Sequence, residues 1–96
     1  MVMKLKPEGT WRNSDGSIKM ILLYIPGKSD VYSVIYSVGE NVSKGQIHLS
    51  NTDDIIWHIT ANDVLGTGFL KFISNEEIEI KTSKIDNMRL KRDLGF

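Results

Sequence analysis

Apolar and polar residues alternate one by one along much of this chain. In the segment 31–38 the even positions are apolar, and the odd positions include Ser33 and Ser37. A period of two residues places successive side chains on opposite faces, which predicts β-strands with one buried face. Residues 18–25 are instead apolar at nearly every position. That pattern predicts a strand covered on both faces, or one whose outer face is a contact surface.

Turn-forming residues separate these segments at short intervals. Asp15 and Gly16 give the strongest hairpin signal, because Asp tolerates a positive φ and Gly favours it. We therefore predict eight strands, over residues 5–13, 18–25, 31–38, 42–49, 55–60, 68–74, 77–82 and 85–92. Short strands at such regular intervals predict an all-β, single-domain antiparallel meander over residues 1–96 that closes into a small barrel, with a β-sandwich as the alternative.

The longest predicted connection covers residues 61–68 and contains Gly66 and Gly68. Helix evidence is confined to this part of the chain, where Thr60 or Asn62 could cap one short turn before Gly66 ends it. We expect at most that one helical turn, within a mobile loop at one end of the sheet.

Composition narrows the classes of function. Lys plus Arg and Asp plus Glu number 12 each, so no net field favours nucleic acid or an anionic membrane as a partner. The chain has no cysteine, which leaves apolar burial as the main source of stability. Because no segment matches a secretory leader or a membrane span, we expect a cytoplasmic protein.

Charge is nevertheless distributed unevenly. Acidic residues gather in one segment, namely Asp53, Asp54, Asp63, Glu76, Glu77 and Glu79, and basic residues in the next, namely Lys81, Lys84, Arg89, Lys91 and Arg92. Two such segments can lie side by side in a sheet, so we predict cross-strand ion pairs in preference to a partner-binding patch.

No catalytic residue is predicted. The chain contains no G-x-S-x-G motif, no cysteine and no phosphate-binding loop. If residues 50–54 form a turn, His48 and His58 fall at diagonal positions on the polar face of a hairpin. Two histidines are too few for a metal site, so we expect them to be solvated, with no metal and no cofactor. The opposite face is predicted core and consists of Ile47, Leu49, Ile55, Trp57 and Ile59.

The first predicted hairpin carries a resemblance. Gly9-Thr10-Trp11 resembles the G-x-W opening of the calycin barrels, the lipocalins and avidins, and residues 9–17 are similar to the first avidin hairpin. This resemblance implies a closed barrel in which Gly9 and Trp11 are structural and a basic residue of the last strand, Arg89 or Arg92, covers the tryptophan. It also nominates Asn13 and Ser17 as ligand contacts.

Two hypotheses of function follow, from different classes. The first is a non-enzymatic binding module that holds an apolar or amphipathic ligand at a barrel mouth lined by Tyr32, Tyr36 and Trp57. The second is an interaction protein, such as a small inhibitor or accessory subunit from a virus or mobile element, or a homodimer. Its interface residues would lie on one strand, and they are Ile21, Leu23 and Ile25. An enzyme that uses His48, His58 and an aspartate is the third alternative.

Overall fold

The alternating segments form a closed antiparallel β-barrel. The computed structural model describes residues 6–28, 30–51, 53, 55–60 and 63–93. Its strands are β1 (Gly9–Arg12), β2 (Ile18–Tyr24), β3 (Val31–Val38), β4 (Asn41–Asn51), β5 (Ile56–Thr60), β6 (Gly68–Ser74), β7 (Glu77–Thr82) and β8 (Met88–Arg92). Each strand pairs with the next, and β1 pairs with β8. The predicted meander and its closure are thus confirmed, and the sandwich alternative is excluded.

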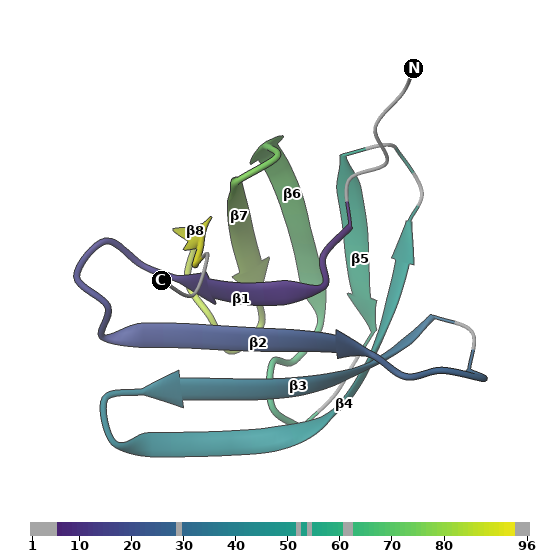
Figure 1. Ribbon diagram of the computed structural model, residues 1–96, viewed down its shortest axis with the longest axis horizontal. Coiled ribbons are helices and arrows are strands. Elements are labelled where there is room, and N and C mark those ends of the chain that lie inside the picture. The colour runs from purple at the N-terminus through teal and green to yellow at the C-terminus, as the bar shows by residue number, and fades with distance from the viewer. Residues whose placement is uncertain (1–5, 29, 52, 54, 61–62, 94–96) are drawn as a thin grey trace.

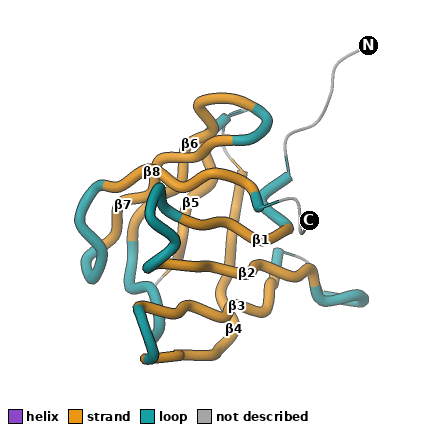
Figure 2. Tube along the Cα trace, turned by 60° about the vertical axis from the view of Figure 1, so that its left-hand side comes forward, coloured by secondary structure: helices purple, strands orange, loops and turns teal. Residues whose placement is uncertain are grey.

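The strands of the barrel lie along two directions. In Figure 1, β1–β3 lie across the view and β5–β7 stand upright, while β4 bends from the first direction into the second. Side chains from all the strands fill the interior of the barrel. The buried core is apolar and includes Met20, Leu22, Val34, Ile47, Leu49, Ile59, Leu70, Ile78, Ile80 and Leu90. Figure 2 shows strands connected by turns, without a helix among the described residues. No helix of this part of the chain could therefore cross a membrane.

One end of the barrel is closed by a stack around Trp11. This tryptophan is fully buried, packs edge-on against Phe72 at 5.9 Å and donates a hydrogen bond from Nε1 to the Pro7 carbonyl at 2.9 Å. The Arg92 guanidinium lies 4.2 Å from the Trp11 ring, in a cation–π contact. Arg92 also donates to the carbonyls of Glu8, Lys6 and Asn75. Arg92 therefore ties the last strand to the segment before β1.

Gly9 makes this stack possible. A Cβ added at Gly9 would lie 2.6 Å from Nη1 of Arg92, and the φ of Gly9 is 137°, a value that other residues rarely adopt. Gly9 and Trp11 thus both take part in this stack. Between the two arginine candidates of the resemblance, the structure selects Arg92. Arg89 is the wrong choice because its position on β8 points outward, where it is 65% exposed and faces Glu79.

The opposite end of the barrel is open at two seams. β4 pairs with β3 along Asn41–His48 but with β5 only along His48–Asn51. Among the described residues, no strand pairs with the other side of residues 41–44 of β4. At the second seam, β1 pairs with β8 through Trp11–Arg92 and Arg12–Lys91 alone. β1 and β8 therefore meet at the closed end and part toward the open end.

Some element boundaries differ from those predicted. β4 continues through the expected turn to Asn51, whose Nδ2 donates to the Asp53 and Ile56 carbonyls and so caps the connection. β8 begins at Met88, three residues later than predicted, because the Thr82 hydroxyl accepts hydrogen bonds from the backbone N–H groups that follow and holds a turn there. The first predicted strand starts at residue 5, which lies outside the described residues.

The described residues of the connection before β6 make several contacts with the barrel. Leu65 is fully buried, and Thr67 and Ser83 bind each other through Thr67 N–H to Ser83 Oγ and Ser83 N–H to the Thr67 carbonyl. A Cβ at Gly68 would lie 2.0 Å from the Lys81 carbonyl oxygen. Gly68 is therefore required for close approach of β6 and β7. Residues 63–65 form a turn, and residues 61 and 62 are not described.

We predict that Arg92 stabilises the barrel and that Arg89 does not. Arg92→Ala should lower the free energy of unfolding by about 2–4 kcal/mol, because it removes the ring contact and the charge-assisted hydrogen bonds to three backbone carbonyls. Arg89→Ala should lower it by less than about 0.5 kcal/mol, since its ion pair is exposed. Urea unfolding of both variants measures the difference. Equal effects would contradict the assignment.

Candidate ligand-binding groove

Tyr32, Tyr36 and Trp57 do not gather at one mouth. Tyr36 lies opposite Ser43 of β4, and Trp57 lies opposite Asn51, eight residues further along the same strand. At about 3.3 Å per residue, these positions are roughly 26 Å apart along β4. Tyr32 lies opposite Ile47, midway between these two positions along β4. The three aromatic residues of the predicted site therefore do not line one pocket.

The two tyrosines occupy different environments. Tyr32 is buried and packs edge-on against Tyr24, with ring centroids 5.5 Å apart. Tyr36 is half-buried at the edge of the core toward the open end. Burial raises the pKa of both phenols, because it disfavours the charged phenolate, and Glu8 adds to the effect at Tyr32.

Trp57 belongs to the core, as the alternation predicted, but with an unpaired polar atom. Its side chain is 6% exposed, and its buried Nε1 has no hydrogen-bond partner among the described residues. Nε1 of Trp11, by contrast, donates to Pro7. A buried donor without an acceptor costs about 1–3 kcal/mol, so packing of the ring must offset this cost. Ile55, predicted for the same core face, is 36% exposed and precedes β5.

Asn13 and Ser17, the ligand contacts implied by the resemblance, are bound to each other. Asn13 Nδ2 donates to Ser17 Oγ at 3.1 Å, and Asn13 Oδ1 accepts from the Ile18 N–H at 3.0 Å. The Ser17 N–H donates to Asp15, and the hydrogen bonds from Ser17 lower the pKa of the Asp15 carboxyl. In the described contacts, both side chains hold the first hairpin together.

The two histidines lie on the outer surface. The β4–β5 register differs from the predicted one, because Ser50 rather than Gln46 lies opposite His58. His48 is still diagonal to His58, and both side chains are exposed. Within the described residues, no group of three or more His, Cys, Asp or Glu side chains is placed to bind a metal ion.

The predicted interface residues are on the outside of β2 and just beyond it. Ile21 lies opposite Ile35 of β3 and is half-buried, whereas Leu23 is 49% exposed. Ile25 follows the strand and donates its N–H to the Val31 carbonyl. The outer face of β2 is therefore only partly covered, as one of the two sequence-based interpretations required.

A groove occupies the open part of the β1–β8 seam. β1 ends at Arg12 because Asn13 begins the hairpin turn, so no residue of β1 pairs with Met88–Leu90. The groove has a volume of about 610 Å³. It is lined by residues of the first hairpin and of β7 and β8, namely Arg12, Asn13, Ser14, Ile18, Glu77, Met88, Arg89, Lys91 and Arg92.

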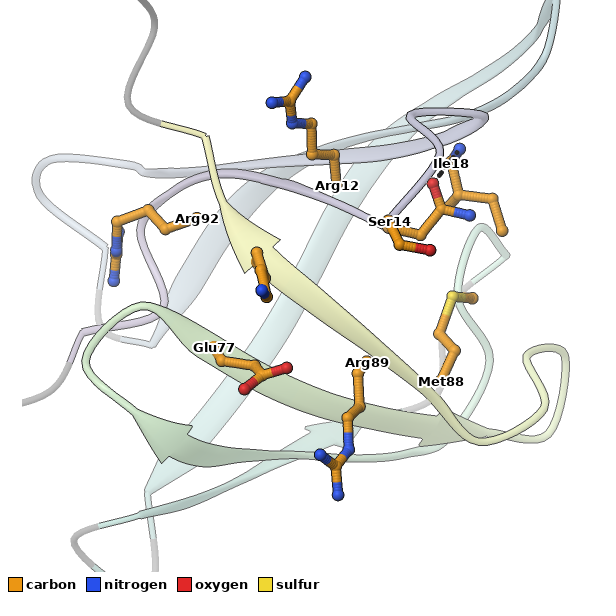
Figure 3. A pocket seen from close by; sticks show the side chains of 9 residues that line it. Arg12, Ser14, Ile18, Glu77, Met88, Arg89 and Arg92 are labelled. Atoms are coloured by element: carbon orange, nitrogen blue, oxygen red, sulfur yellow. Dashed lines mark hydrogen bonds between the residues drawn. The ribbon is translucent and has the colours of Figure 1, made fainter.

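The groove has an apolar side and a basic side. Ile18 and Met88 point toward one another, as Figure 3 shows, and both pack against the core. Arg12, Arg89 and Lys91 supply positive charge from the outer faces of β1 and β8. Arg92 points away from the other labelled residues in Figure 3, in keeping with its place over Trp11. The groove can thus contact a hydrocarbon and an anion at the same time.

Sequence reasoning did not identify this groove. It noted the uneven charge, and one ion pair of the predicted kind is present. Glu79 lies opposite Arg89, with Oε2 and Nε 3.9 Å apart, and Glu77 lies opposite Lys91. Arg12, however, reaches the same site from β1, and no signal in the sequence sets the register between the first and last strands.

We predict that Tyr36 titrates above the ordinary tyrosine pKa of about 10. Because the folded state retains the phenolic proton, its contribution to stability is complete below pH 10 and falls as pH rises through the raised pKa. Tyr36→Phe should remove one late component from the absorbance titration at 295 nm, and should lessen the loss of stability in alkali. If Tyr36→Phe instead removed a component that titrates at the ordinary tyrosine pKa, the phenol of Tyr36 would not be shielded from water as described.

Comparisons of the chain with protein-family models, with curated proteins and with solved structures found no match.

Proposed function

We propose that this protein is a non-enzymatic binding module that holds an amphipathic small molecule in the β1–β8 groove. The observation that carries this proposal is the groove itself, which combines Ile18 and Met88 with the cations Arg12 and Lys91. Its volume of about 610 Å³ falls within the range of small-molecule sites, about 300–1,000 Å³. An apolar surface with a few charged groups is the usual lining of such sites.

The scaffold around the groove favours a binding role. The Trp11–Arg92 stack holds β1 against β8 at the closed end. The two strands that form the walls of the groove separate from this fixed contact. A site supported by packed strands keeps its shape before the ligand arrives, which reduces the entropy lost on binding. The same stack is the feature implied by the calycin resemblance, and it supports a calycin-type barrel as part of this proposal.

We expect monomeric decanoate or decanol to bind saturably at this groove. Met88→Gln and Ile18→Ser should each weaken binding about tenfold, because each removes apolar contact worth roughly 1.4 kcal/mol. Ile73→Ser is the matched control, since Ile73 is 43% exposed on β6 and does not line the groove. Isothermal titration measures affinity, and backbone amide shifts locate the ligand. If neither amphiphile binds the wild-type protein, or both shift residues elsewhere, the proposed function is wrong.

A second candidate function is self-association through the free edge of β4. Within the part of the chain that the structure describes, no second strand pairs with residues 41–44, and Val42 is 55% exposed. Val64 packs beside Gly45, so the open stretch is residues 41–44. An unpaired edge is a template for another strand, and antiparallel addition of a second copy would satisfy its backbone groups.

This candidate predicts a dimer in sedimentation experiments at high protein concentration. Val42→Glu should shift the population to monomer, because two like charges would meet across the new strand pair. Ile73→Glu adds the same charge on β6 and should leave the dimer intact. A wild-type protein that stays monomeric throughout would exclude the candidate.

A further inference from the structure

Three cations lie in one row on the outer face of the barrel beside the groove. Lys19 of β2 lies directly opposite Arg12 of β1, and Arg12 lies directly opposite Lys91 of β8. All three side chains are exposed. Directly opposite residues have Cβ atoms about 4.5–5.5 Å apart, so the row spans roughly 10 Å. We call these three residues the cation row.

This arrangement of charges is not expected to increase the stability of the folded protein. Like charges at directly opposite positions of neighbouring strands destabilise a sheet. The chain has as many acidic as basic residues, so its composition does not force cations together. Within the described residues, the ion pair within 4.0 Å is Arg89–Glu79, and no member of the cation row takes part in one. A destabilising charge cluster in a neutral protein points to a bound group of opposite sign.

Two acidic residues lie next to the row: Glu77, and Asp93, which follows Lys91 by two positions and donates its N–H to the Thr10 carbonyl of β1. Glu77 lies opposite Lys91, at the β7 end of the row, and is the one acidic residue among those that line the groove. The strand position next to Lys19 on its other side is Ser37, which is uncharged. Arg12, in the centre of the row, therefore has a cation on each side.

We propose that the cation row binds the anionic head of the amphipathic ligand, a carboxylate, sulfate or phosphate group. This assignment rests on the proposed function and names the ligand class of the same groove. Arg12 and Lys91 belong both to the row and to the groove, whose apolar side is formed by Ile18 and Met88. The anionic head would lie at Arg12 and Lys91, with its chain against Ile18 and Met88. Arg12 offers a planar fork of donors that suits a carboxylate or phosphate.

A paired titration tests the head group. Decanoate and decanol have the same chain and differ in charge, so the wild-type protein should bind decanoate at least about tenfold more tightly. Affinity for decanoate should also decrease as salt increases, because exposed charges are screened. Arg12→Gln combined with Lys91→Gln should abolish this preference while changing the affinity for decanol less than about twofold.

The matched control removes the same amount of charge elsewhere. Lys71 and Lys81 are exposed on β6 and β7 and do not line the groove, so Lys71→Gln combined with Lys81→Gln should retain the preference for decanoate. Urea unfolding supplies a second measurement that does not depend on a ligand. Arg12→Gln should raise the unfolding midpoint, because it relieves repulsion from both neighbours. A lowered midpoint would contradict the repulsive cluster.

Each remaining outcome is decisive. Equal binding of decanoate and decanol overturns the anionic head but leaves the proposed function standing, whereas no binding of either removes both. Inorganic phosphate that binds as tightly as decanoate would show a site for free anions and overturn the amphipathic ligand. Capture by phosphatidylglycerol vesicles without binding of monomeric decanoate would assign the row to a membrane surface and overturn the proposal.

Discussion

The contact between Arg92 and Trp11 is the interaction on which the rest of this barrel depends. It joins the last strand to the first, and its hydrogen bonds bring in the segment before β1, 84 positions away along the chain. Burial lowers the pKa of Arg92, an effect that Glu76 partly opposes, but an arginine remains charged under all ordinary conditions. The positive charge is therefore held permanently between an aromatic face and backbone carbonyls. Without it, closure would rely on the short backbone pairing of β1 and β8 at Trp11–Arg92 and Arg12–Lys91.

The same pair of strands also creates the opening. β1 is four residues long and leaves β8 after Arg12, where the Asn13–Ser17 hydrogen bonds turn the chain back. Closure at one end and separation at the other are two consequences of a short first strand. The groove is thus a product of strand length and hairpin chemistry, and no inserted loop is needed to form it. Because its walls are paired strands on both sides, its shape follows from the architecture of the barrel.

Charge has two different roles on this surface. Between β7 and β8, acidic and basic side chains face each other, which is the arrangement expected of a sheet that uses exposed charge for solubility and register. Across β2, β1 and β8, cations face cations, and this arrangement opposes stability. Natural sequences usually agree with their fold at every level, and local conflicts are found where function requires them. The location of this conflict, beside the groove, connects it with binding.

The sequence by itself determined the all-β class, most of the strands and the turns that join them. These features depend on side-chain alternation and turn residues, which act over a few neighbouring positions. Only the tertiary structure decided that Arg92 rather than Arg89 covers Trp11, that Tyr36 and Trp57 lie far apart along β4, and that Arg12 lies beside Lys91. Each of these depends on the register between strands. A shift of one residue reverses every side chain of a strand, and between the first and last strands no short turn fixes the register.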